Sequence, residues 1–442
     1  MGRDDCGRGI QFEMEHNKFD RYLTDENLIF IENEYIRLGA NLSLGGALTY
    51  LAEKGRKNLI NSWDWGRQVQ MSCYSGPVPF QPEGTEMAEC WKFIGWNPIQ
   101  SGDHYGNRSN ILEYRAEGTE LYVKCVPMHW PLDNYPGECT YEVWYRLNGR
   151  SVDVTAKINN ARPDKTFYAA RNQELPAVYT NGEWYKAVSY VGKEPFTGGE
   201  LTELVTKDDG LGWPWIYFSP TENWSALVDD DNYGLGVYNG ITNLAAIGFA
   251  GVENKGWGGP KDGQTGYIAP ITTEILDHNI EFSYDYSLIV GSVDFIRQTV
   301  YEKDQAADRR CYDFSKGREH FYYAGITDQG YPTNGCLAFA FSAGAEWKSP
   351  DVFIGKGDHT ALELELAFDG EITGEVVCQV YEGIDEKHWR KLRPFAVPFT
   401  LSASGERATH RIDLSAVPDA MVGFSIRFGC EGSLKAYKLA IL

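Results

Sequence analysis

The sequence predicts a mostly-β protein built from two successive antiparallel β domains. Aromatic residues make up 14% of the 442 residues, and 47 glycines and 19 prolines accompany them. Aromatic residues favour strands, whereas glycine and proline favour the turns between strands. Polar and apolar residues alternate with period two in many short segments, the pattern of strands with one buried face. Helical periodicity is scarce, so few helices are expected.

The segments with this alternation define the first domain. In RQVQMSCY, the apolar residues at every second position from Val69 point one way, and Gln70 points the other. The same pattern recurs in ELYVKCVPMHW, CTYEVWYRL, SVDVTAKINN and NIEFSYDYSLIVG. NWSALVDDDNYGLGVYN predicts a hairpin with its tip at residues 229–232. Residues 292–302 are predicted to form one connecting helix after the last strand of this domain.

A charged segment separates the two groups of predicted strands. The chain turns polar between residues 303 and 319, in KDQAADRRCYDFSKGRE. Beyond it, about six short strands separated by turn residues indicate a jelly-roll-like β-sandwich. We therefore expect residues 1–302 to form the catalytic domain, residues 303–345 a linker and bridging segment, and residues 346–442 an accessory domain that supplies no site residue.

Composition argues against several kinds of partner. The formal net charge of −21 repels phosphate backbones, so no nucleic acid is expected. The longest apolar runs fall far short of the about 20 residues that a membrane helix requires, so no membrane partner is expected. The nine cysteines have no CxxC pair or metal-finger spacing and are interpreted as free, mostly buried thiols. No nucleotide or metalloprotease motif is present, and the sequence predicts no cofactor and no metal.

The start of the chain and its thiols favour a cytoplasmic location. MGRDDCGRGIQFEMEH has no apolar h-region, and unpaired cysteines fit a reducing compartment. Export after removal of a signal is the alternative. Sequence leaves open whether the chain forms a homo-oligomer.

The stretch from Ser62 to Asn107 has the composition of a carbohydrate cleft. It combines four tryptophans with an arginine, a histidine and several amides. Tryptophan offers a flat apolar face for a sugar ring, and amide and charged groups fix hydroxyls by directional hydrogen bonds. The alternative is a large β protein whose long loops bury tryptophan as anchors.

Three segments resemble the galactose-mutarotase-like supersandwich, a fold shared by aldose epimerases and by domains of several glycoside hydrolases and polysaccharide lyases. ENEYIRLGANLSLGGALTYLAEKGRKNLINSWDWGRQVQ is similar to its first strands, GDHYGN to the loop that presents a histidine to the sugar, and IEFSYDYSLIVG to its closing strand. The resemblance implies an antiparallel supersandwich and a carbohydrate-active protein. The Asn-His strand of the epimerases is missing. ARNQELPAVY stands in its place and carries Glu174, which disfavours simple mutarotation.

Three residues are candidates for catalysis. Glu174 lies among aromatic residues, which would raise its pKa toward that of a general acid; a surface glutamate paired with Arg171 or a lysine is the alternative. His104 follows Asp103, which could orient an imidazole that titrates near neutrality; a solvated loop histidine is the alternative. Asp64 is the candidate second carboxylate that a glycosidase needs, with a turn cap as the alternative.

Ten further residues are candidates for substrate binding. Arg67 offers a fork of donors for two hydroxyls or a carboxylate. His129, at a predicted strand end, would act as a partner or a stacking subsite, and Trp215 adds stacking surface. The full set is Arg67, Gln70, Trp63, Trp65, Trp91, Trp96, Asn107, His129, Trp130 and Trp215.

The leading functional hypothesis is hydrolysis of the glycosidic bonds of an oligosaccharide by carboxylate and histidine acid–base catalysis. A polysaccharide lyase and an aldose epimerase on the same fold are alternatives. A non-catalytic glycan-binding protein would show the same tryptophan-rich cleft, because a fold does not fix a function. In each case the expected partner is an oligosaccharide or polysaccharide.

Overall fold

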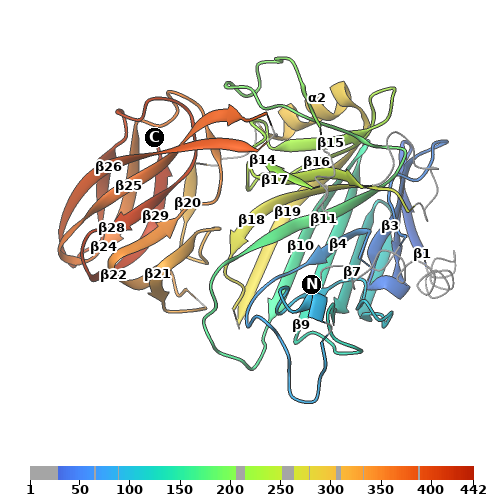
Figure 1. The fold of residues 1–442 in the computed structure, drawn as a ribbon, viewed down its shortest axis with the longest axis horizontal. Helices are drawn as coiled ribbons and strands as arrows, with labels where there is room; N and C mark the ends of the chain where they lie inside the picture. Colours follow the sequence, from blue (N-terminus) through green and yellow to red (C-terminus); the bar gives the residue numbers. More distant parts are fainter. Residues whose placement is uncertain are drawn as a thin grey trace.

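In the residues that it describes, the computed structural model of the chain contains three β-sheets with antiparallel pairing (Figure 1). The first two sheets face each other, and the third lies to one side of them. The residues described are 28–63, 66–87, 89–205, 215–250, 263–277, 279–304, 310–331, 333–386 and 389–442.

The first sheet runs in the order β1-β2-β3-β4-β11-β18-β17-β14, with β5 joining β4 to β8. Two 3₁₀ turns, η2 (Leu42–Leu44) and η3 (Glu89–Trp91), lie in its connections. Its strands are β1 (Leu28–Glu32), β2 (Ile36–Asn41), β3 (Ala47–Glu53), β4 (Val69–Ser72), β5 (Pro98–Ile99), β8 (Met128–His129), β11 (Arg171–Asn181), β14 (Ile216–Phe218), β17 (Ala245–Ala250) and β18 (Thr265–Glu274).

The second sheet runs in the order β13-β12-β15-β16-β19-β10-β9-β7-β6. Its strands β15 and β16 form the hairpin that the sequence predicted. Its strands are β6 (Asn110–Glu117), β7 (Glu120–Val126), β9 (Cys139–Asn148), β10 (Ser151–Asn160), β12 (Lys186–Ser189), β13 (Thr202–Leu204), β15 (Trp224–Val228), β16 (Tyr233–Tyr238) and β19 (Ile280–Ser292).

The third sheet runs in the order β26-β25-β28-β22-β29-β24-β27, and its two ends approach each other, so that it curls into a nearly closed sandwich. Its strands are β20 (Cys311–Asp313), β21 (Tyr322–Asp328), β22 (Leu337–Lys348), β23 (Phe353–Ile354), β24 (Ala361–Ala367), β25 (Asp369–Ile384), β26 (Arg390–Ser404), β27 (Ala408–Asp413), β28 (Met421–Phe428) and β29 (Gly432–Ile441).

Period-two alternation places the core between the first two sheets. Val69 and Met71 of β4 and Val154 of β10 belong to one apolar cluster, while Gln70 lies outside that cluster on β4. A separate cluster around Trp347 and Phe321 fills the third sheet. The mostly-β class and the antiparallel sheets that the sequence predicted are therefore confirmed.

The predicted helix is α2 (Val293–Asp304), which packs on the second sheet. Its apolar side chains Val293, Ile296 and Val300 are buried against β15 and β16. Gly236 makes this contact possible, since a Cβ there would lie 2.3 Å from a side-chain carbon of Ile296. Among the described helices, none is long and apolar enough to cross a membrane.

The segment expected as a linker takes part in the third sheet. β20 pairs with β29, and β21 pairs with β22, so strands begin well before residue 346. Polar composition suggested a linker, but this segment alternates: Tyr312 and Phe314 point into the core of the third sheet. The division into domains at residues 302 and 346 stays a prediction.

Buried polar contacts join the third sheet to the first two. The guanidinium of Arg318 donates to both carboxylate oxygens of Asp328, at 2.7 and 3.1 Å, and lies 3.7 Å from Asp277. His320 Nδ1 lies 2.8 Å from a carboxylate oxygen of Glu274, in β18. Contacts of this kind fix one part of the chain against the other, because a charge left unpaired in the interior is costly.

Candidate functional site

Glu174 lies near the middle of the outer face of the first sheet. Its neighbours in β11, Leu175 and Val178, point into the core between the sheets, and alternation turns Glu174 to the opposite side. It is paired with Ser72 of β4 and with Ile271 of β18. Strands on both sides therefore hold its backbone, which is the rigid support that a catalytic side chain needs.

Two tyrosine hydroxyls hold the carboxyl group of Glu174. Tyr267 donates to one oxygen at 2.6 Å, and Tyr74 donates to the other at 3.3 Å. Burial raises the pKa of Glu174, and the hydrogen bonds from Tyr267 and Tyr74 offset part of this rise. A raised pKa keeps more of the carboxyl protonated near neutrality, as the sequence predicted for a general acid.

An aromatic wall continues from these tyrosines along the same face; Tyr267 within it is buried, and Tyr179 and Trp215 are half-buried and offer its accessible surface. The rings of Trp215 and Tyr267 have centroids 4.8 Å apart, and Tyr179 lies 4.9 Å from Tyr267 and 6.5 Å from Trp215. The structure thus brings the predicted Trp215 close to Glu174. It adds Tyr74, Tyr179 and Tyr267, which the sequence analysis did not select.

A second aromatic group surrounds His104. Its ring centroid lies 5.9 Å from both Trp91 and Trp130 and 3.9 Å from Tyr105. The backbone N–H of His104 donates to the carbonyl of Trp130 at 3.2 Å. Three predicted site residues, His104, Trp91 and Trp130, therefore form one cluster.

Asp103 shapes this loop through the backbone. Its carboxylate accepts hydrogen bonds from the backbone N–H groups of Tyr105, Asn107 and Asn134 and from the side chain of Asn107, at 2.8 to 3.0 Å. The Asn107 side chain also donates to Asp133 at 2.8 Å. Asp103 and Asn107 thus work as loop supports in this structure, which differs from the sugar contact predicted for Asn107.

Arg171 links the His104 cluster to β11. Its guanidinium donates to the carbonyls of Ser75, Ile94 and Phe93, and it lies over the ring of Tyr74, 5.8 Å from the centroid. These carbonyls belong to the segment that connects β4 to the tryptophan-rich loop. The guanidinium of Arg171 is thus bound to backbone carbonyls and does not form the ion pair with Glu174 that was the alternative.

The prediction that Trp96 and His129 bind substrate is wrong in this structure. Both side chains are 0% exposed, so neither offers a face to a sugar. The indole N–H of Trp96 and Nε2 of His129 both meet one carboxylate oxygen of Glu138, at 3.1 and 2.9 Å. Burial lowers the pKa of His129. The two residues anchor a loop on the core. This is the alternative that the sequence left open, in which long loops bury tryptophan as anchors.

The remaining predicted residues lie along β4 and the segment before it. Arg67 donates to the carbonyl of Gly263 at 2.9 Å, and Trp63 lies against the same glycine. Gln70 is buried and accepts the backbone N–H of Ser101 at 3.0 Å, so it serves as a support here. Asp64 and Trp65 lie outside the described residues.

Cys90 corrects the prediction of free thiols. It is disulfide-bonded, whereas Cys73, Cys125, Cys139, Cys311, Cys336, Cys378 and Cys430 are free. Within the described ranges, no three His, Cys, Asp or Glu side chains gather as metal ligands would.

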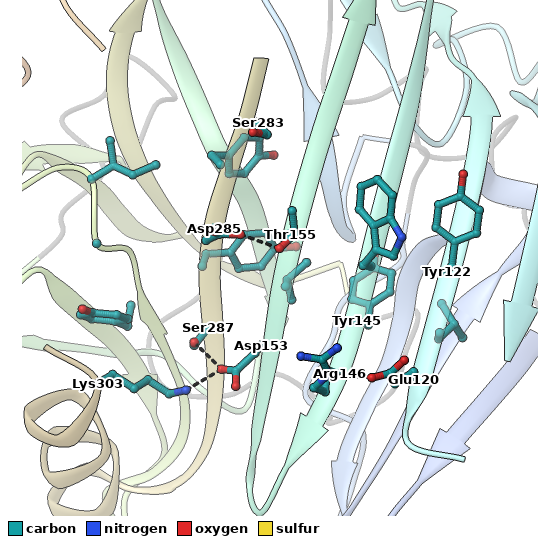
Figure 2. A pocket seen from close by; sticks show the side chains of 18 of the residues that line it. Glu120, Tyr122, Tyr145, Arg146, Asp153, Thr155, Ser283, Asp285, Ser287 and Lys303 are labelled. Carbon is teal, nitrogen blue, oxygen red and sulfur yellow. Dashed lines mark hydrogen bonds and ion pairs between the residues drawn. The ribbon is translucent and has the colours of Figure 1, made fainter. Parts of the chain in front are cut away.

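A competing cavity of about 640 Å³ lies on the outer face of the second sheet (Figure 2). Its polar side chains bond to one another: Asp153 to Lys303 at 2.5 Å and to Ser287 at 2.8 Å, and Asp285 to Thr155 at 2.5 Å. The pairs Asp153–Ser287 and Asp285–Thr155 join the neighbouring strands β10 and β19, and cross-strand pairs of this kind stabilise a solvated sheet face. We therefore place the candidate site at Glu174.

Comparison with known proteins gives likeness in fold. No family model and no curated protein matches the chain. It is similar to the solved structure of a galactose mutarotase related enzyme from Lactobacillus acidophilus, with 13% identity and a TM-score of 0.37 over 60% of this chain and 97% of that one. It is also similar to the structure of a galactose mutarotase-like protein from Lactobacillus casei ATCC 334, with 11% identity and a TM-score of 0.37 over 60% of this chain and 99% of that one.

The C-terminal part is similar to a mutant family 29 carbohydrate binding module, with 14% identity and a TM-score of 0.20 over 28% of this chain and 79% of the module. The predicted resemblance to the galactose-mutarotase-like fold is confirmed for 60% of the chain. At these identities and TM-scores the likeness carries nothing about activity, substrate or site residues.

The raised pKa of Glu174 predicts a pH-dependent effect of Glu174→Gln on stability. A carboxyl whose pKa is higher in the folded than in the unfolded state stabilises the fold fully below the unfolded value, about 4.3, and loses that contribution as pH rises through the folded value. Glutamine has no such loss. Thermal unfolding should show the variant gaining melting temperature relative to wild type between about pH 4 and pH 8. A difference that stays constant over this range would contradict the raised pKa.

Proposed function

We propose that this chain is a carbohydrate-active enzyme that hydrolyses glycosidic bonds of an oligosaccharide, with Glu174 as general acid. One observation carries the proposal: a carboxyl group with a raised pKa, held by two phenols, lies beside an aromatic wall on the outer face of a rigid sheet. Aromatic faces suit the apolar face of a sugar ring, and a positioned acid suits cleavage of an acetal.

In the proposed reaction, protonated Glu174 donates its proton to the glycosidic oxygen as the bond to the anomeric carbon breaks. The hydroxyls of Tyr267 and Tyr74 remain hydrogen-bonded to the carboxylate that forms and stabilise its charge. Water supplies the hydroxyl group that the anomeric carbon gains. A second carboxylate must take the proton of that water or form a covalent intermediate. Asp64 stays the candidate for this role.

A specific observation favours a second candidate, aldose epimerisation. Among the described residues, the side chains that donate hydrogen bonds to the carboxyl of Glu174 are the phenols of Tyr267 and Tyr74. The site therefore combines one carboxyl group with two weakly acidic hydroxyls. Interconversion of sugar anomers needs proton transfer to and from oxygen and no carboxylate that attacks carbon. A carboxyl and a phenol within hydrogen-bond distance could supply both proton transfers.

One assay separates these reactions. The protein is incubated with neutral and acidic oligosaccharides while reducing ends, absorbance of unsaturated uronates and optical rotation of free aldoses are followed. New reducing ends without absorbance support hydrolysis. Both signals together mean a lyase, and faster relaxation of optical rotation alone means an epimerase. Binding without any of these signals would show a glycan-binding protein and refute the enzymatic proposal.

A further inference from the structure

A cavity of about 810 Å³ lies where the outer face of the first sheet meets the third sheet. Ligand sites in proteins occupy about 300–1,000 Å³ and are frequent between packed units. The first sheet and its loops contribute four residues to its lining: Asn172, Tyr217, Leu244 and Thr273. The third sheet and its loops contribute an exposed tryptophan, Trp389, and five charged side chains: Glu346, Lys348, Asp351, Arg390 and Arg427.

This cavity continues the face that carries Glu174. Asn172 stands two positions before Glu174 in β11, so both side chains lie on the same side of the sheet. The hydroxyl of Thr273 in β18 donates to the side chain of Asn172 at 2.9 Å. Burial raises the pKa of Tyr217, and the charge of Glu174 adds to this rise. Asn172 therefore belongs both to the face that carries Glu174 and to the lining of the cavity.

Two aromatic rings stand at the wall of the cavity. Trp389 lies at the end of the hairpin formed by β25 and β26, and its ring is nearly parallel to that of Tyr217, with an interplanar angle of 18° and centroids 6.1 Å apart. Trp389 is 46% exposed, although it is a large apolar side chain. An exposed indole beside a phenol offers the flat surface on which a sugar ring packs.

The charged side chains of the cavity are already paired with each other. Arg390 lies 2.7 Å from Asp351, Lys348 and Arg427 each lie 2.8 Å from Glu346, and Arg427 also lies 3.7 Å from Glu375, outside the lining. A charged ligand would have to break such pairs or remain uncompensated, which costs free energy in a partly buried site. Hydroxyl groups can use the donors and acceptors that remain on paired ions. The lining therefore suits a neutral sugar.

We propose that this cavity is a glycan subsite in which Trp389 and Tyr217 bind a neutral sugar residue several units along the chain from the bond at Glu174. The inference rests on the proposed function and names its substrate class: a neutral oligosaccharide long enough to reach from β11 to the third sheet. It gives the C-terminal part a direct role in substrate binding, where the sequence predicted an accessory domain without site residues.

Binding of oligosaccharides of graded length tests the subsite. Glu174→Gln protein, in which turnover is expected to be about 100-fold or more lower, is titrated calorimetrically with neutral glucan, mannan and xylan oligosaccharides and with uronate-containing chains. Adding Trp389→Ala should weaken binding of the longer neutral chains roughly five- to tenfold and leave disaccharides unchanged. Trp389→Phe should restore most of the affinity, since it keeps an aromatic face.

Tyr114→Ala is the matched control, since it removes an exposed aromatic side chain from β6, at the edge of the second sheet. It should bind every chain as the parent does. Equal affinity of Trp389→Ala and parent protein for long chains would overturn the subsite while leaving the proposed function intact. If the protein binds uronate-containing chains more tightly than neutral ones, and Trp389→Ala loses that binding, the assignment of a neutral sugar to the subsite would be overturned. Binding of no glycan at all by wild-type protein would overturn both proposals.

Discussion

Replacing Glu174 by glutamine is expected to lower turnover about 100-fold or more and to leave the fold intact. Glutamine keeps the shape of the side chain, and its carbonyl can still accept a hydrogen bond from Tyr267 or Tyr74. It has no proton to give to a leaving oxygen. Because the loss falls on the chemical step, kcat should drop while KM stays close to the wild-type value. Steady-state kinetics on the substrate found in the oligosaccharide assay measure this.

Glu142 provides the matched control for this substitution. It also accepts a hydrogen bond from a tyrosine, Tyr122 at 2.7 Å, but it lies on the outer face of the second sheet. Glu142→Gln should keep full turnover. Tyr267→Phe removes the shorter hydrogen bond to Glu174 and should give a smaller loss than Glu174→Gln. Undiminished activity of Glu174→Gln would remove Glu174 from the mechanism and return the question to Asp64 and His104.

Strand alternation explains why much of the fold could be predicted from the sequence. Alternation is a local property: it predicts Val69 and Gln70 on opposite sides of one strand, and in the structure Val69 lies in the core cluster while Gln70 lies outside it. Glu174 could be singled out because aromatic residues flank it in the sequence. The partners of Glu174 come from elsewhere: Tyr74 follows β4, and Tyr267 lies in β18. Which strands pair is a property of the whole chain, so these tyrosines had no local signal beyond their alternation.

Residue type alone misled the prediction where core and cleft use the same residues. Trp96 and His129 suit a sugar site by type, but both are buried around Glu138. Trp389 suits a sugar site by type as well, but it lies in a part of the chain that the sequence predicts to be accessory. Its contact with Tyr217 depends on how the third sheet sits against the first, which no segment of the sequence records.

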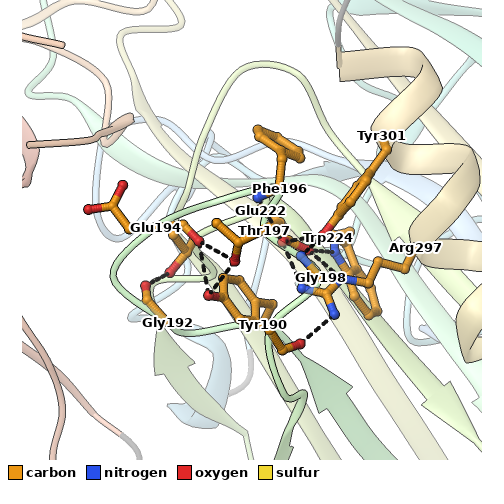
Figure 3. A network of polar contacts seen from close by, with 12 residues as sticks. Tyr190, Gly192, Glu194, Phe196, Thr197, Gly198, Glu222, Trp224, Arg297 and Tyr301 are labelled. Atoms are coloured by element: carbon orange, nitrogen blue, oxygen red, sulfur yellow. Dashed lines mark hydrogen bonds and ion pairs between the residues drawn. The ribbon is translucent and has the colours of Figure 1, made fainter.

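Replacing Glu222 by alanine is expected to lower the free energy of unfolding by about 3–5 kcal/mol. This glutamate, 0% exposed, is the centre of a polar network between α2 and residues 190–199 (Figure 3). It accepts hydrogen bonds from Nε and Nη2 of Arg297 at 3.0 and 2.8 Å, from the hydroxyl of Tyr301 at 2.7 Å and from the indole of Trp224 at 3.1 Å. The backbone N–H of Phe196 donates to it at 2.9 Å.

Alanine would leave the largely buried guanidinium of Arg297 without its carboxylate, and this uncompensated charge accounts for most of the expected loss. Chemical denaturation of both proteins measures the difference. Glu183→Ala is the matched control, because Glu183 forms an exposed ion pair with Lys57 at 3.0 Å, and such pairs contribute at most about 1 kcal/mol. If Glu222→Ala loses no more stability than Glu183→Ala, the network does not hold residues 190–199 against α2, and the packing of that segment must come from its apolar contacts instead.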